Sequence, residues 1–208
     1  MKLLDLYCGA GGAAMGYYQS GFDDITGVDI IPQPHYPFKF VIMNALDYLD
    51  AFGSEFDLIH ASPPCQRFSS LGFDKQYKAD WLTPTLNLLS LVNRPYVVEN
   101  VPHSPMRKDL ELCGAMFGLR VIRHRWFQTP CHIPAPVHPP HSQPIQNFSA
   151  WQSLTHQNYI TVAGHTFSAH DGRIAMQIDW MTRAELAQAV PPAYTRYIGD
   201  WILKSNKL

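Results

Sequence analysis

The sequence has little charge, no long hydrophobic run and few cysteines. Only 16% of its 208 residues are charged, and the formal net charge is −1. Overall charge therefore gives no indication of nucleic acid or membrane binding, and any basic surface must be local. No apolar run reaches the roughly 18 residues that a membrane-spanning helix needs. Asp5 and a glycine cluster interrupt the start, MKLLDLYCGAGGAAMG, so we expect no secretory signal.

The four cysteines are Cys8, Cys65, Cys113 and Cys131. They lie too far apart for the disulfide framework of a small secreted domain. We therefore expect free thiols and a reducing, cytoplasmic-type compartment.

Short apolar runs alternate with helical stretches through the first half of the chain, which predicts an α/β fold. The predicted strands are residues 2–7, 25–30, 38–43, 56–61 and 95–100, and the predicted helices are 11–20, 81–92 and 181–190. We expect regular structure to return at residues 159–165. Thr182 and Glu185 form a capping-box pattern at the start of the last helix. Residues 129–158 contain too many prolines for regular structure and predict an irregular insert.

Polar and glycine residues follow the first three predicted strands. Gly9 and Gly11 follow the first strand and allow a sharp turn that a ligand can approach beside a helix N-terminus. Asp29 ends the second strand, where an acid can bind ribose hydroxyls, and Asn44 follows the third. Asp29 capping a turn and Asn44 capping a helix are the structural alternatives. Because all these positions meet at one edge of the sheet, the pattern favours a nucleoside site.

Cys65 and Glu99 follow or end the fourth and fifth predicted strands. Pro63 and Pro64 restrict the backbone just before Cys65. A lone cysteine is more often a small buried hydrophobic residue than a nucleophile. A carboxyl on the next strand end, with a pKa raised by burial, makes a nucleophile and acid pair plausible.

Four short motifs resemble those of the cytosine-5 DNA methyltransferase family and occur in the order DLYCGAGG, SPPCQRFS, ENV and RHRWF. The C-terminal stretch MTRAELAQAVPPAYTRYIG resembles the last motifs of that family. The resemblance implies a Rossmann-like class I methyltransferase fold with a mostly parallel sheet and helices on both faces. It implies S-adenosylmethionine as methyl donor and double-stranded DNA as substrate, in restriction-modification of a bacterial or phage-infected cell. We expect a cytoplasmic monomer, with a catalytic domain of residues 1–128 and 159–208 around a small target-recognition insert, 129–158.

The resemblance also implies roles for single residues. Its catalytic positions are Cys65 as nucleophile, Glu99 at the cytosine edge and Arg125 at the carbonyl oxygen of the base. Its cofactor positions are Asp5, Tyr7, Gly9, Gly11, Asp29, Ile30, Asn44 and Pro63. Its DNA contacts are Gln66, Arg67, Ser69 and Arg123. The implied reaction methylates carbon 5 of a flipped-out cytosine through a covalent Cys65 adduct.

Two stretches depart from the family pattern. Val121 stands where the family has a glutamine, and Ala187-Gln188 stands where it has a Gly-Asn pair. These departures motivate one alternative, a catalytically silent regulator that binds DNA or S-adenosylmethionine. The small insert and the low net charge motivate a second, methylation of a free cytosine nucleotide.

The recognition region offers further candidate ligands. Aromatic and basic side chains that could contact DNA are Trp126, Phe127, Phe148, Trp151, Arg107, Lys108, Arg120, Arg123 and Arg125. Candidate metal ligands are Cys131, His132, His138 and His141, with Cys113 as a further one if it lies nearby. Their spacing fits no standard zinc pattern, and adjacent Cys131 and His132 suit a tetrahedral site poorly, so we predict no metal.

Overall fold

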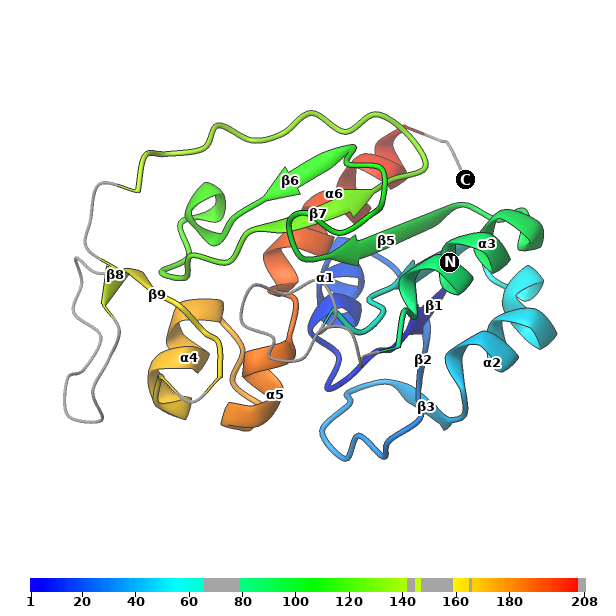
Figure 1. Cartoon of the computed structure of the whole chain (residues 1–208), viewed down its shortest axis with the longest axis horizontal. Coiled ribbons are helices and arrows are strands. Elements are labelled where there is room, and N and C mark those ends of the chain that lie inside the picture. Colours follow the sequence, from blue (N-terminus) through cyan, green and yellow to red (C-terminus); the bar gives the residue numbers. More distant parts are fainter. Residues whose placement is uncertain (66–78, 142–144, 147–158, 165, 206–208) are drawn as a thin grey trace.

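The computed structural model describes residues 1–65, 79–141, 145–146, 159–164 and 166–205, and its main feature is a seven-stranded sheet (Figure 1). The strands are β1 (Lys2–Leu6), β2 (Asp24–Asp29), β3 (Lys39–Ile42), β4 (Leu58–Ala61), β5 (Tyr96–Asn100), β6 (Leu110–Leu112) and β7 (Arg125–Gln128). Their order across the sheet is β3-β2-β1-β4-β5-β7-β6. The first five are parallel, and β7 is antiparallel to both of its neighbours. The strand order reverses between β1 and β4, where open α/β sheets bind ligands.

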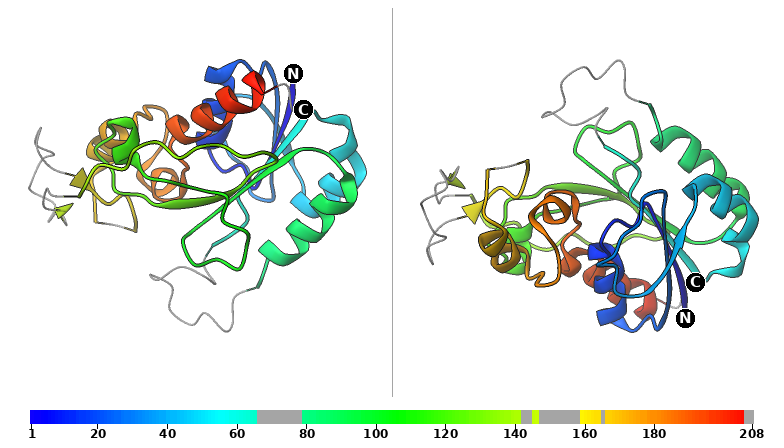
Figure 2. Two further views of the ribbon diagram at one scale, coloured as in Figure 1. Left: turned by 90° about the horizontal axis from the view of Figure 1, so that it is seen from above. Right: turned by 90° about the horizontal axis from the view of Figure 1, so that it is seen from below.

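Helices cover both faces of the sheet. The helices are α1 (Gly12–Ser20), α2 (Ala45–Phe52), α3 (Leu82–Val92), α4 (Ala169–Met176), α5 (Arg183–Gln188) and α6 (Pro192–Lys204). Figure 2 shows α1 and α6 together on one side of the sheet and α2 and α3 on the other. The predicted three-layer α/β arrangement is therefore confirmed.

The alternation of side chains along the strands explains the two cores. Leu3 belongs to the core beneath α1 and α6, whereas Leu4, the next residue, belongs to the core beneath α2 and α3. Leu58 and Ile59 of β4 divide in the same way. Successive residues of a strand point to opposite faces, so strands covered on both sides are apolar at nearly every position.

Polar side chains cap the N-termini of α5 and α3. Thr182 caps α5 and forms the predicted capping box with Glu185. Asp80 accepts hydrogen bonds from the backbone N–H groups of Leu82 and Thr83 at the start of α3.

Within residues 159–165, where regular structure was expected to return, the structure has the short strand β9 (Tyr159–Ile160). β9 pairs with β8 (Ile145–Gln146), and Ile160 also bonds to the backbone of Arg120 and Ile122. The antiparallel strands β6 and β7 were not predicted, because neither follows the strand-helix alternation that identified the parallel strands.

All four cysteines lie among the described residues and are free thiols, as predicted. Within those residues, no helix combines the length and hydrophobicity required to cross a membrane.

Candidate functional site

The glycine loop after β1 lies at the point where the strand order reverses. Tyr7, Gly9 and Gly11 have positive φ angles of 56°, 48° and 83°, so the loop uses left-handed backbone three times in five residues. A Cβ on Gly11 would lie 2.7 Å from Cδ of Pro37, whereas a Cβ on Gly9 would meet nothing within 4 Å. Gly11 is thus required by packing, and Gly9 leaves open space through which a ligand can reach the backbone.

Asp29 at the end of β2 holds this loop in place. Its Oδ2 accepts a hydrogen bond from Gly9 N at 3.1 Å, and its Oδ1 accepts one from Ile31 N at 3.0 Å. A carboxylate has further lone pairs, so these bonds leave Asp29 able to accept hydrogen bonds from a ligand. Ile30, the next residue, is 66% exposed, and Ile42, which pairs with Asp29 on β3, is 60% exposed. The edge therefore combines a carboxylate with apolar surface.

Three predicted cofactor residues have structural partners of their own. Asn44 caps α2, with its Oδ1 accepting a bond from Leu46 N at 2.8 Å, which is the structural alternative foreseen for it. The Tyr7 hydroxyl lies 2.8 Å from Thr85 Oγ1 on α3. Asp5 is completely buried, and its Oδ2 accepts a bond from the Tyr36 hydroxyl at 3.3 Å. Burial raises the pKa of Asp5 well above its usual range, which the Tyr36 bond only partly offsets. Asp5 thus has a partner within the protein, and its contact with a cofactor stays a prediction.

Glu99 and Arg125 form a buried ion pair beside the turn that carries Cys65. Arg125 Nε lies 2.7 Å from Glu99 Oε1, and their side chains are only 14% and 9% exposed. Glu99 lies opposite Phe127 in the pairing of β5 and β7, so Arg125 is its diagonal neighbour on the same face. Burial raises the pKa of Glu99, as expected, and the charges of Arg125 and Arg123 oppose that rise.

Cys65 follows β4 and is half-buried next to this pair. Burial is the main reason why its pKa is raised, and the Glu99 charge adds to the rise, while Arg125 and Arg123 lower it. Cys65 is therefore a neutral thiol at neutral pH in the protein as it stands. It would become a nucleophile only once a bound substrate changed this balance of charges.

Asn100 was not singled out in the sequence, although it connects the two strand ends. Its Nδ2 donates to the carbonyl oxygen of Pro63 at 3.0 Å, and its Oδ1 accepts from Val101 N and Ser104 Oγ. The side chain is completely buried. Asn100 thereby fixes the Pro-Pro-Cys turn to the strand that carries Glu99.

A series of buried hydrogen bonds leads from Tyr17 through His60 and Ser62 to Glu99. The Tyr17 hydroxyl lies 3.1 Å from His60 Nδ1, His60 Nε2 lies 2.9 Å from Ser62 Oγ, and Ser62 hydrogen-bonds to Glu99. An ionised Glu99 only accepts, so Ser62 donates to it and His60 carries its proton on Nε2. Burial lowers the pKa of His60 to about 3, which keeps it neutral. The sequence does indicate these hydrogen bonds, because His60 is a polar residue in an otherwise apolar strand.

Arg123 occupies a different place from the DNA contact expected of it. Its side chain is 6% exposed, and its guanidinium donates to the carbonyl oxygens of Val162 at 2.6 Å and Ala187 at 2.9 Å. Burial and the neighbouring charge of Arg125 lower its pKa to about 9. Arg123, two residues before β7, thus connects to α5 and to the segment between β9 and α4. Its charge still acts on Cys65 and Glu99, although its side chain is buried.

The other residues predicted to contact DNA lie in several different environments. Gln66, Arg67, Ser69, Phe148 and Trp151 lie outside the described residues. Phe127 is completely buried and packs the core. Arg107 and Lys108 are paired with Asp109 and Glu111, and Lys108 also lies 5.0 Å from the centre of the Trp126 ring.

The four candidate metal ligands from the sequence do not come together. Cys131 lies against α6, with its Sγ 4.0 Å from Ser205 Oγ, and His132 is exposed. His138 and His141 instead meet Cys113 and His124. His124 was missed because it is separated from the other histidines by the whole of β7.

Comparisons with known proteins identify relatives of this chain. Residues 1–102 match the family model of the C-5 cytosine-specific DNA methylases. The type II methyltransferase M.HgiGI of Herpetosiphon aurantiacus is 32% identical over 84 residues, which are 35% of this chain and 65% of that protein. The matched part thus spans slightly less than two thirds of that curated relative.

Two solved structures share the fold. One is assigned as a DNA modification methyltransferase encoded within an E. coli prophage, with a TM-score of 0.67, 14% identity and coverage of 98% of this chain and 99% of that chain. The other is the Dnmt2 methyltransferase of S. pombe, with a TM-score of 0.62, 14% identity and coverage of 100% and 99%. At this identity the likeness establishes the class I methyltransferase fold.

Proposed function

We propose that this chain, whose residues 1–102 match the family model of the C-5 cytosine-specific DNA methylases, transfers a methyl group from S-adenosylmethionine to carbon 5 of cytosine in double-stranded DNA. The observation that carries this proposal is the buried pair of Glu99 and Arg125 at 2.7 Å beside Cys65. A carboxyl, a guanidinium and a thiol at one strand edge are the groups that addition to a pyrimidine ring requires.

The edge formed by β1, β2 and β3 fits the cofactor. The open space at Gly9 suits close approach to the backbone, Asp29 retains acceptor capacity for ribose hydroxyls, and exposed Ile30 offers an apolar face to an adenine. S-adenosylmethionine bound there would supply the activated methyl group. This site and Cys65 follow the adjacent strands β1 and β4, so methyl donor and acceptor base would meet where the strand order reverses.

Cys65 is the proposed nucleophile. Its sulfur would form a bond to carbon 6 of the cytosine, which makes carbon 5 electron-rich enough to take up a methyl group. Transfer of the carbon 5 proton to water or another base would then restore the ring double bond and expel the Cys65 thiolate. Because carbon 6 is inaccessible inside a duplex, the base must first leave the stack, at a cost of a few kcal/mol.

Glu99 and Arg125 are proposed to hold the base. With its pKa raised by burial, Glu99 can carry a proton toward ring nitrogen 3 and stabilise the adduct. Arg125 donates to Glu99 through Nε, and its other donors would serve the carbonyl oxygen of the base. Asn100 would keep Cys65 at a fixed distance from both residues through Pro63.

We also propose that residues 129–158 recognise the target sequence while residues 1–128 and 159–208 perform the transfer. The start of this insert packs against α6, where the Tyr197 hydroxyl donates to the carbonyl oxygen of Pro134 at 2.7 Å. The free thiols suit a reducing cytoplasm, and a monomer would bring one such insert to each target.

The function is tested with radiolabelled S-adenosylmethionine and unmethylated duplex DNA. The wild-type protein should label the DNA, Cys65→Ser should not, and Cys131→Ser, which changes a thiol far from the site, should retain the activity. DNA containing 5-fluorocytosine should trap wild type as a denaturation-resistant complex, because fluorine at carbon 5 blocks release of Cys65. Labelling of deoxycytidine nucleotides in place of DNA, or cofactor binding without any methyl transfer, would overturn the proposal.

A further inference from the structure

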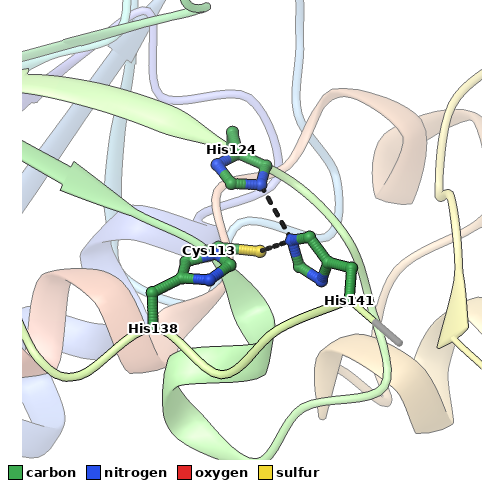
Figure 3. A group of neighbouring side chains, drawn as sticks. All are labelled: Cys113, His124, His138 and His141. Atoms are coloured by element: carbon green, nitrogen blue, oxygen red, sulfur yellow. Dashed lines mark hydrogen bonds between the residues drawn. The ribbon is translucent and has the colours of Figure 1, made fainter. Parts of the chain in front are cut away.

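Cys113, His124, His138 and His141 form a cluster at the edge of the sheet opposite β3. Cys113 directly follows β6, and His124 directly precedes β7, while His138 and His141 come from the proline-rich segment. Figure 3 shows the four side chains converging, with contacts joining His141 to both Cys113 and His124. One potential ligand atom from each lies within 4.8 Å of all the others.

The distances between these atoms are close to those around a tetrahedral ion. Cys113 Sγ lies 3.8 Å from His141 Nε2, and His124 Nε2 lies 3.1 Å from the same nitrogen. Zinc bonds of ordinary length at tetrahedral angles would separate sulfur and nitrogen by about 3.6 Å and two nitrogens by about 3.3 Å. Small rotations of the side chains would therefore be sufficient to complete the geometry.

A carboxylate behind the cluster orients one of its histidines. Glu111 Oε1 lies 3.0 Å from His124 Nδ1 and so directs Nε2 of the same ring toward the cluster. A carboxylate on the far nitrogen of a histidine is the usual support of a metal ligand, because it fixes the ring and the proton.

Two nitrogen atoms in the cluster need an explanation. His138 Nε2 and His141 Nδ1 are buried and have no hydrogen-bond partner among the described residues. Cys113 is completely buried. Polar atoms in such a position normally find a partner, and an ion at the centre would supply one for His138 Nε2. His141 would bind through Nε2, the nitrogen that faces Cys113 and His124, so the ion explains only the first of the two atoms.

We propose that Cys113, His124, His138 and His141 bind a structural zinc ion. A thiolate and three imidazoles are ligands that zinc prefers, and four protein ligands close the coordination sphere without a position for substrate. This site differs from the set predicted from the sequence, because Cys113 and His124 replace Cys131 and His132.

The ion would fasten the proline-rich segment to the sheet. Within the described part of residues 129–146, β8 (Ile145–Gln146) is the only regular element, and the segment has few apolar side chains to bury. Metal ligation supplies folding free energy where a core is too small to do so. His124 is also adjacent to Arg125 in the chain, so the ion would connect the insert to the strand that carries the partner of Glu99.

The test is the zinc content of the full-length chain after loading with zinc and dialysis into metal-free buffer. Mass spectrometry of the metal should find about one zinc ion per wild-type chain. Cys113→Ser and His141→Ala should lose most of it. Cys131→Ser and His132→Ala change the same residue types nearby and should keep it.

Cobalt provides a readout that does not depend on whether the variants fold. Wild-type and Cys131→Ser protein, stripped with a chelator and refilled with Co²⁺, should both show thiolate-to-cobalt charge-transfer absorption and tetrahedral visible bands. A wild-type chain without retained zinc, a cobalt spectrum without thiolate absorption, or equal metal loss in the Cys131 and His132 variants would overturn the proposal. None of these measurements depends on methyl transfer, so the site and the proposed function succeed or fail separately.

Discussion

Arg125 contacts Glu99 through an Nε to Oε1 distance of 2.7 Å, from the diagonal position of the neighbouring antiparallel strand. The pair is buried, and both of its charges act on the pKa of Cys65, in opposite directions. Glu99 therefore has two separable effects. It raises the pKa of the thiol, and in the proposed reaction it stabilises the adduct.

Replacement of Glu99 by glutamine separates these effects. Glu99→Gln keeps the shape but removes the charge that raises the Cys65 pKa, so alkylation of Cys65 by iodoacetamide should shift to lower pH. Methyl transfer should nevertheless fall by roughly 10²–10⁴-fold, because the proton donor is lost. Peptide mass spectrometry across a pH series measures the first effect, and DNA labelling measures the second. Glu55→Gln, at an exposed position, is the control, and a Cys65 profile unchanged by Glu99→Gln would contradict the electrostatic coupling.

Asn100 is expected to be a positioning residue. Asn100→Asp keeps the acceptor for Val101 and Ser104 but loses the donor to Pro63. A buried carbonyl left without its donor costs about 1–3 kcal/mol, and a buried charge costs more. Urea unfolding should show this loss, and methyl transfer should fall even at temperatures where the variant is fully folded. Asn93→Asp at an exposed helix end serves for comparison. Full activity of the folded Asn100 variant would show that the turn is held by other contacts.

The two loop glycines should respond differently to alanine. Gly9→Ala places a methyl group in open space with a strained φ of 48°, for a cost of about 1–2 kcal/mol. Gly11→Ala adds contact with Pro37 and Tyr36 to the same kind of strain, so its melting temperature should fall further. Calorimetry with S-adenosylmethionine should find that folded Gly9→Ala binds more weakly than wild type. Unchanged affinity in that variant would place the cofactor away from Gly9.

The sequence predicted the parallel half of the sheet well because both of its faces are covered. Strands such as KLLDL and LIHA are apolar at most positions, and the ligands of an α/β sheet gather at the strand ends. These two rules are sufficient to predict Asp29, Cys65 and Glu99 at one edge of the sheet. β6 and β7 escaped because three or four residues of an antiparallel hairpin carry too little periodicity.

Contacts between distant segments could not be predicted from the sequence. Arg123 has the charge of a DNA contact, and only the fold shows Val162 and Ala187 accepting its hydrogen bonds. The histidine cluster likewise combines two residues flanking β6 and β7 with two from the proline-rich segment. Spacing along the chain carries no information about such a site when its ligands come from separate elements.

His60 should make the protein sensitive to acid. Its pKa is lowered to about 3 by burial, from an ordinary value of 6.5. Below pH 6.5 the unfolded chain therefore binds a proton that the folded chain does not, and stability falls as the pH drops from 6.5 toward 3. The expected loss between pH 8 and pH 5 is about 2 kcal/mol, measured by urea unfolding at both values. His60→Gln, which can still bond to Tyr17 and Ser62, should lose much of this pH dependence, whereas His170→Gln at an exposed position should keep it. Equal acid sensitivity of wild type and the His60 variant would mean that other groups control the transition.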